Sequence, residues 1–294
     1  MKLSKLAAAG AMAALAGASL LGCSSSSGSG SGSGASLAGT TLTYWATNQG
    51  PSLQADSTIL TPELNKFTKE TGIKVNLQVI PWTTDDTKIL AATVSGKGPD
   101  VLNFGNTDAW TFGATGALLP WTSSQLSQVG GSGKFIPNVL AAAGQAPYTS
   151  LPLYSQAYGL FYNKAMFTQA GLTPPTTWQE LVTDAKSLTK PSTQTYGLAI
   201  QGASVSESMH FAYIFARQNG GSPFNAQEQP TFTTAGNVNG LKQYLDLMSS
   251  GVINPSDAQD STGTLQASEF AHGKAGMIMV QNGSMSALAS LGMT

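Results

Sequence analysis

Cysteine, arginine and histidine are scarce in this sequence of 294 residues. It holds one cysteine, Cys23, one arginine, Arg217, and two histidines, His210 and His272. A single cysteine cannot form a disulfide within one chain, and two histidines without cysteine partners do not predict a zinc site. Carboxylate and sulfate ligands are usually held by bidentate guanidinium groups. The lack of arginine therefore favours a neutral, hydroxyl-rich ligand, for whose rings the five tryptophans and eight tyrosines supply stacking faces.

The motifs of several enzyme classes are absent as well. The sequence has no Gly-x-Ser-x-Gly elbow and no phosphate-binding loop. A glycosidase needs two carboxylates that face each other across the scissile bond. The acidic residues near predicted strand ends are chiefly Asp100, in a Gly-Pro-Asp turn, and Asp108. The segment 257–263 lacks the EF-hand spacing and is interpreted as a turn. We expect no enzyme, no cofactor and no metal site, with a secreted glycoside hydrolase as the weaker alternative.

Residues 1–22 have the composition of an export signal. Lys2 and Lys5 form a charged start, and the apolar core that follows is too short and too rich in alanine and glycine for a stable membrane span. The sequence LLGC ending at Cys23 matches the bacterial lipobox, in which the cysteine is lipidated before cleavage. A Ser/Gly-rich run suited to a flexible tether occupies residues 23–37. We expect a lipid anchor on Cys23 at the outer face of the cytoplasmic membrane, or in the periplasm of a host with two membranes.

The remaining chain is slightly acidic. Loss of Lys2 and Lys5 with the signal leaves 12 basic residues against 15 acidic ones, a net charge of −3. Nucleic acid is therefore not an expected partner. At about 150 residues per domain, the length from residue 38 onward predicts two lobes. We place the first at residues 38–154 and the second at residues 155–294.

The first lobe alternates strand and helix patterns. Thr61 reads as a helix N-cap with Pro62 at the first helical position, and Gly72 ends that helix. Alternation of this kind predicts a parallel sheet with helices on both faces. We expect only one short helix, at 137–143, in the irregular stretch 125–149. The expected strands cover residues 42–45, 73–79 and 100–104, and further helices cover residues 85–94 and 109–115.

The second lobe begins with an aromatic strand pattern at Tyr158 to Tyr162. A short helix follows and stops at Gly171, and Thr177 and Glu180 then form a capping box for the next helix. Further strands are expected at 196–200 and 276–280, and further helices at 207–219, 237–250 and 265–272.

The stretch 151–190 carries a family resemblance. Its YGLFYNK run and its GLTPPTTWQE block, at their mutual spacing, resemble the extracellular solute-binding proteins that include the maltose-binding protein, the capture subunits of ABC importers. Further matches are KFTKETGIKV at 66–75, GKGPDV at 96–101, TGALLP at 115–120 and FAHGKAGM at 270–277. The resemblance implies an α/β, periplasmic-binding-protein-like fold of two hinged lobes with mostly parallel sheets. It also implies a sugar ligand in the interlobe cleft and membrane permease subunits as partners.

Candidate ligand-binding residues come from two arguments. In open α/β sheets a ligand sits beyond the carboxyl ends of the strands, so the loops after the strands are candidates. The resemblance places sugar contacts in the same loops. The predicted ligand-binding residues are Asn48, Gln49, Phe104, Asn106, Asp108, Gln156, Ser208, His210, Asn282 and Met285.

Several of these residues have a structural interpretation too. Asp108 could lie in a first helical turn, favoured there by the helix dipole. Phe104 fits the core as well as a stacking platform, and His210 could be an ordinary helix residue. Trp82 and Trp110, in or near loops, are open to either role. A receptor for a non-sugar solute stays a further alternative.

The chain stops at Thr294 in what looks like the start of a helix. Members of the family normally continue, cross back to the first lobe and return to the second. We therefore expect the 294 residues to be a fragment of a longer gene product.

Anchoring through Cys23 is directly testable. Replacing Cys23 by Ser removes the only thiol that could carry lipid, so the Cys23→Ser variant should leave the membrane fraction. The measurement is the distribution between membrane and soluble fractions after a carbonate wash. A variant that stays bound to the membrane would contradict lipid anchoring.

Overall fold

The computed structural model describes residues 37–227 and 229–293. The predicted signal, Cys23 and the tether up to residue 36 lie outside the described residues. Within the described ranges no helix is both long enough and apolar enough to cross a membrane. Two three-stranded sheets organise the chain, one in each half of the sequence.

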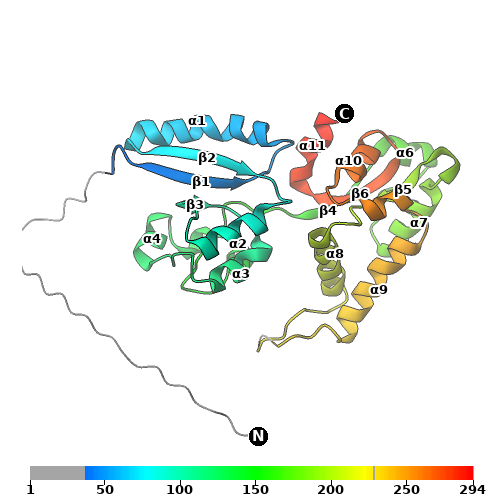
Figure 1. Ribbon diagram of the computed structural model, residues 1–294. Helices are drawn as coiled ribbons and strands as arrows, with labels where there is room; N and C mark the ends of the chain where they lie inside the picture. Colours follow the sequence, from blue (N-terminus) through cyan, green and yellow to red (C-terminus); the bar gives the residue numbers. More distant parts are fainter. Residues whose placement is uncertain (1–36, 228, 294) are drawn as a thin grey trace, which may run out of the picture. The chain divides into compact units, whose positions relative to one another are not determined.

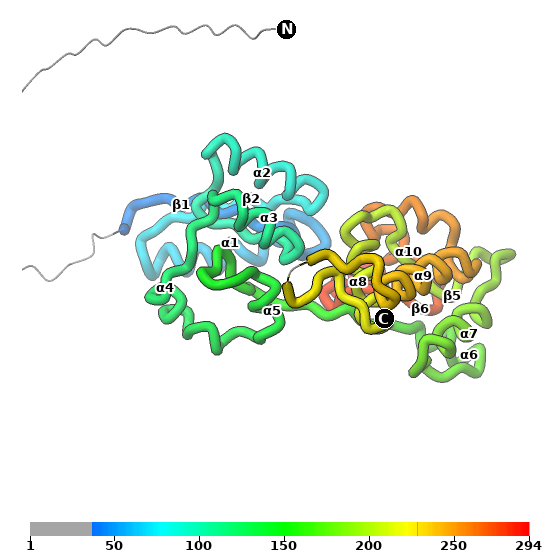
Figure 2. The backbone as a smooth tube through the Cα atoms, turned by 90° about the horizontal axis from the view of Figure 1, so that it is seen from below, coloured from blue at the N-terminus to red at the C-terminus, as the bar shows by residue number. Residues whose placement is uncertain are grey.

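The first sheet is parallel throughout. It comprises β1 (Thr41–Thr47), β2 (Lys74–Ile80) and β3 (Val101–Leu102), in the order β2-β1-β3. The sheet lies between α1 (Leu53–Thr71) and α2 (Asp85–Ser95), as Figures 1 and 2 show together. The predicted helices on both faces are thus present.

Short helices complete this half of the chain. They are α3 (Ala109–Ala114), α4 (Ser123–Gln128) and α5 (Pro137–Ala142), with the single-turn η1 (Asn106–Asp108) directly before α3. The boundary predicted between residues 154 and 155 falls in the irregular segment that leads to the second sheet, and it stays a prediction.

The predicted start of the first helix at Thr61 is wrong. The Ser52 side chain caps α1 by accepting a hydrogen bond from the Ala55 amide at 3.1 Å, and Pro62 lies inside the helix. A proline removes one backbone donor, which a 19-residue helix with an effective cap tolerates at this position. The predicted end is confirmed, because Gly72 adopts the left-handed conformation with φ 74°.

Two further elements differ from the sequence analysis. The stretch after Pro120 contains α4, whose capping box pairs Thr122 with Gln125 in both directions. The third strand is shorter than expected, and side chains add hydrogen bonds to β1 at both of its ends. Asp100 accepts from the Thr43 amide at 2.7 Å, and Asn103 accepts from the Thr47 amide at 3.2 Å.

The second sheet mixes strand directions. Its strands are β4 (Tyr158–Tyr162), β5 (Tyr196–Ala199) and β6 (Ala275–Gln281), in the order β4-β6-β5. The β5–β6 pair is parallel and the β4–β6 pair is antiparallel. The helices of this half are α6 (Lys164–Ala170), α7 (Trp178–Leu188), α8 (Val205–Gln218), α9 (Ala235–Ser249), α10 (Thr264–Ala271) and α11 (Met285–Ser290).

Helix α8 is fixed in place by its contact with α9. The two helices run side by side (Figure 2), and Phe211 and Phe215 of α8 pack against Tyr244 of α9 with ring centroids 5.9 and 5.8 Å away. Gly240 brings the backbones together, because a Cβ there would overlap the backbone of Ala216. The packing matters for function because α8 carries predicted site residues.

This close approach predicts a stability loss in Gly240→Ala. Alanine has a higher helix propensity than glycine. The overlap of its methyl group with the backbone of α8 should outweigh that gain and lower the free energy of unfolding by about 2 kcal/mol. The control is Gly133→Ala, where a Cβ meets no atom within 4 Å. Urea denaturation measures both variants. Equal stability of Gly240→Ala and the unmodified protein would show that α8 and α9 are not in contact at this point.

Candidate functional site

A buried carboxylate shapes the loop after β1. Asp56 of α1 accepts hydrogen bonds from the Gln49 amide at 2.6 Å, the Gly50 amide at 2.7 Å and the Asn48 side-chain nitrogen at 2.7 Å. Asn48 therefore helps to hold the loop, whereas the Gln49 side chain is exposed. Sequence reasoning missed Asp56 because the helix was expected to begin further along the chain.

Phe104 is partly buried and packs against a core ring. Its ring meets that of Phe112 edge-on, with centroids 5.1 Å apart and an interplanar angle of 90°. Phe112 is buried in the core. The structural interpretation of Phe104 is therefore favoured over a stacking platform. Asn106, two residues on, is exposed at the start of η1.

Asp108 belongs to a group of acidic side chains. Burial raises its pKa, and so do the charge of Asp86 and a hydrogen bond between the two carboxyls, while Thr107 donates to its Oδ2 at 3.2 Å and acts in the opposite direction. Burial, followed by the charge of Asp86, raises the pKa of Asp85 to about 6. These groups would accept hydrogen bonds from hydroxyls, and a protonated carboxyl could also donate one.

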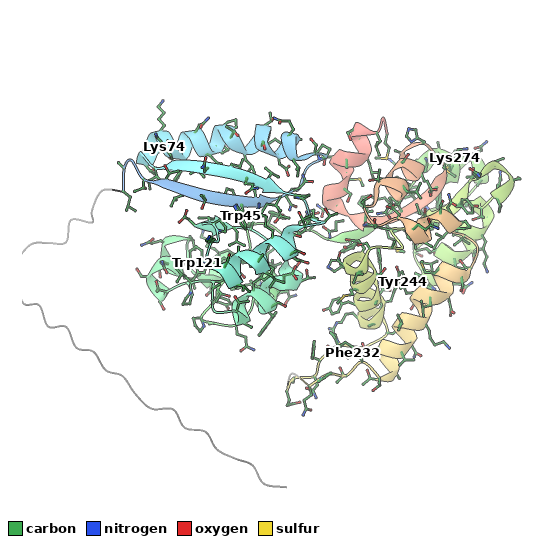
Figure 3. All side chains as sticks on the ribbon, in the orientation of Figure 1. Trp45, Lys74, Trp121, Phe232, Tyr244 and Lys274 are labelled. Carbon is green, nitrogen blue, oxygen red and sulfur yellow. The ribbon has the colours of Figure 1, made fainter. Side chains whose placement is uncertain are left out.

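Lys88 does not neutralise the acidic side chains of Asp85, Asp86 and Asp108 by an ion pair. Its ammonium lies 4.2 Å from the ring centroid of Trp45, on the side of β1 that faces α2 (Figure 3). Burial lowers the pKa of Lys88. Trp45 is partly buried, and the ammonium of Lys88 lies over its ring in a cation–π contact.

The second sheet gathers polar side chains around the hydroxyl of Tyr158. This hydroxyl donates to Glu207 Oε2 at 2.8 Å, accepts from Gln281 Nε2 at 2.9 Å and lies 2.9 Å from His210 Nδ1. Burial raises the pKa of Tyr158 well above its ordinary value, so the hydroxyl keeps its proton. The arrangement orients Glu207 and His210, each partly exposed, at the start of α8.

Gln156 and Asn282 meet next to this group. The Asn282 side chain accepts from the Ala157 amide at 2.9 Å, and the Gln156 side chain accepts from the Gly283 amide at 3.2 Å. A side chain at position 283 would overlap the Gln156 amide. The structure thus connects Gln156 and Asn282, through the neighbouring Gln281 and Tyr158, with His210. That these residues bind a ligand stays a prediction.

The predicted site residues Ser208 and Met285 contact other side chains in the second half of the chain. Ser208 Oγ accepts from the Tyr244 hydroxyl at 3.5 Å, toward α9. Met285 packs against a core cluster that includes Ile278 and Leu288. Their predicted ligand contacts stay predictions. Sequence reasoning missed Glu207, although it lies three residues after the N-cap Ser204, whose side chain accepts from its amide at 3.3 Å.

A buried pair of carboxyls anchors the loop that leads to α8. Asp257, in η4 (Pro255–Gln259), accepts from the Ile200 amide at 3.0 Å through its side chain and from the Gly202 amide at 2.9 Å through its backbone. Glu269 of α10 lies against Asp257 and accepts a hydrogen bond from Asn254. Burial, followed by the charge and the hydrogen bond of Glu269, raises the pKa of Asp257. Burial also raises the pKa of Glu269, while its hydrogen bonds with Asn254 and Asp257 act in the opposite direction. The charge of Asp260 raises the pKa of both carboxyls. One proton shared by the pair removes the repulsion between two buried charges.

Comparison with known proteins identifies the family. Residues 50–290 match the family described as bacterial extracellular solute-binding protein. The chain belongs to that family. Its members bind solutes and are not enzymes. Among residues 37–227 and 229–293, no three His, Cys, Asp or Glu side chains are grouped so as to hold a metal ion.

The curated relatives are longer than this chain. A protein of Brucella abortus (strain 2308) named as a binding protein is 25% identical over 210 residues, which cover 71% of this chain and 50% of that one. The mannitol-binding protein of Pseudomonas aeruginosa is 31% identical over 138 residues, 46% of this chain and 31% of that one. The chain thus spans about half the length of the first curated relatives it matches.

Solved structures share the fold. The solute-binding protein of Agrobacterium radiobacter K84, in complex with ribitol, is 28% identical with a TM-score of 0.69, covering 83% of this chain and 61% of that one. That of Thermotoga lettingae TMO, bound to α-D-tagatose, is 26% identical with a TM-score of 0.75, covering 86% and 64%. The predicted α/β, periplasmic-binding-protein-like fold is confirmed.

The carboxyl pair predicts a stability that falls as the pH rises. Asp257 holds a proton in the folded state that the unfolded chain releases above its ordinary pKa of about 4, so raising the pH from about 5 to 8 should lower the free energy of unfolding by at least about 1 kcal/mol. Asp257→Asn should reduce this dependence, whereas the exposed Asp246→Asn should leave it unchanged. Urea denaturation at several pH values measures it. Stability that is constant or rises over this range would contradict a shared proton.

Proposed function

We propose that this chain is the substrate-capturing subunit of an ABC importer. It binds a neutral sugar or polyol between two lobes and delivers it to the transmembrane permease subunits. Lipid on Cys23 holds it at the outer face of the cytoplasmic membrane. The observation that carries the proposal is the group of Tyr158, Glu207, His210 and Gln281, a hydrogen-bonding set beside the predicted site residues Gln156 and Asn282.

The charges around the candidate residues support a neutral ligand. The only arginine, Arg217, donates to the Gly221 carbonyl at 3.1 Å near the end of α8, and Lys88 lies over Trp45. Carboxylates and amides predominate instead at the strand ends. These groups accept hydrogen bonds from hydroxyls and repel anions.

The relatives support the same ligand class. One similar protein is named for mannitol, and two similar structures contain ribitol and α-D-tagatose. All three compounds are uncharged and rich in hydroxyls. We infer a ligand of this chemistry for the present chain. A receptor for a non-sugar solute is the alternative that a ligand screen separates.

Hydrolysis is disfavoured by the spacing of the carboxyls. Asp86 and Asp108 are within hydrogen-bonding distance of each other. Glycosidase carboxyls stand about 5–9.5 Å apart to leave room for the substrate or a water molecule. The ligand should therefore be recovered chemically unchanged.

Binding by the full-length protein tests the proposal. Calorimetric titration should detect ribitol, mannitol, tagatose or another neutral sugar, and no binding of gluconate. Glu207→Gln should weaken the binding roughly tenfold, because an ionised acceptor forms stronger hydrogen bonds with ligand hydroxyls than an amide does. The control is Glu70→Gln on the exposed side of α1.

Three outcomes would contradict parts of this account. Binding of a peptide or amino acid with no binding of any sugar or polyol would remove the carbohydrate ligand and keep the receptor. Turnover of a glycoside by the pure protein would favour the hydrolase. Unchanged affinity in Glu207→Gln would exclude the Tyr158 group from the ligand site.

A further inference from the structure

We propose that Trp82 is the aromatic surface against which the ligand packs in the first lobe, in place of Phe104. This inference rests on the proposed function, because it specifies the ligand as a neutral sugar or polyol with a C–H face. Such a face packs on the flat apolar ring of an indole while its hydroxyls point to polar groups at the ring edge.

The position of Trp82 supports this role. It lies two residues beyond β2 and ahead of α2, at the carboxyl edge of the first sheet, where ligands bind in open α/β sheets. It is 48% exposed, so its indole ring is accessible to a ligand.

Polar groups adjoin the same ring. A Cβ built on Gly105 would lie 3.4 Å from Trp82 Cζ3, 3.5 Å from Asp108 Oδ2 and 3.3 Å from Thr107 Oγ1. The indole edge, a carboxyl and a hydroxyl therefore converge on one point beside a residue without a side chain. Asp86 adds a second carboxyl in hydrogen-bonding distance of Asp108. A flat ring with hydrogen-bonding groups at its edge is the arrangement that a hydroxyl-bearing ligand requires.

The other aromatic candidates are less suitable. Phe104 is engaged edge-on by Phe112, Trp45 is covered by Lys88, and Trp178 packs edge-on against Phe215 at 5.1 Å. Trp110, which is 53% exposed on α3, is the strongest competitor among the tryptophans near the predicted site residues. The contact with Gly105, beside Asp108, distinguishes Trp82 from it.

Substitutions in the full-length protein test the proposal. Trp82→Ala should weaken ribitol, mannitol or tagatose binding by about tenfold or more, and Trp82→Phe, which keeps a ring, should weaken it less. Trp82→Phe should also lose most of the change in tryptophan fluorescence that ligand causes in the unmodified protein. The control is Phe232→Ala, an exposed ring in the segment between α8 and α9 (Figure 3).

Gly105→Ala gives a second, independent perturbation. The backbone at Gly105, with φ −67° and ψ 141°, suits any residue. The added methyl group would lie 3.3 Å from Thr107 Oγ1 and in van der Waals contact with Trp82 and Asp108. It should therefore shift the Thr107 hydroxyl slightly, fill the space between the indole and the carboxyl, and lower the affinity without unfolding the protein. Melting temperatures of all variants verify that they fold.

The outcomes separate the two claims. If the unmodified protein binds these ligands and Trp82→Ala binds them within twofold of it, the inference is overturned while the proposed function stands. Loss of binding in Trp110→Ala but not in Trp82→Ala also overturns it. If the unmodified protein binds no neutral sugar or polyol, the proposed function fails and the inference falls with it.

Discussion

The antiparallel pairing of β4 with β6 is the constraint on which the candidate site in the second half of the chain depends. Its register sets Tyr158 opposite Gln281, which brings the phenol and the amide together. The pairing continues past the strand ends through Ala157 and Asn282, which exchange two hydrogen bonds. A shift by one residue would turn these side chains to the other face of the sheet. Register thus decides the chemistry of the site.

Carboxylates with few cationic partners shape the described part of the chain. Asp56 holds the loop after β1 through two backbone amides and one side chain, and Asp257 holds the end of β5. Hydrogen bonds from backbone amides satisfy such groups without a positive charge nearby. The loops that carry the candidate residues are therefore set by buried acids. An anionic ligand would meet an unfavourable field in the same places.

Local sequence signals predicted most of the fold. Gly72 and Gly171 end their helices in the left-handed conformation, and the capping box of Thr177 and Glu180 begins α7 as expected. The helix start predicted at Pro62 is wrong because a helix-start signal and a tolerated interior proline look the same in one sequence. Residues whose role depends on long-range contacts could not be predicted. Asp56 and Glu207 acquire theirs only when the loop after β1 and strand β4 are in place.

The structure of the full-length protein with a bound neutral polyol tests the central claim most directly. The account predicts a ligand hydroxyl within hydrogen-bonding distance of the Glu207 carboxylate or the His210 ring, with the Tyr158 hydroxyl still joined to Glu207. A polyol bound away from both side chains, or an anion held there instead, would contradict it.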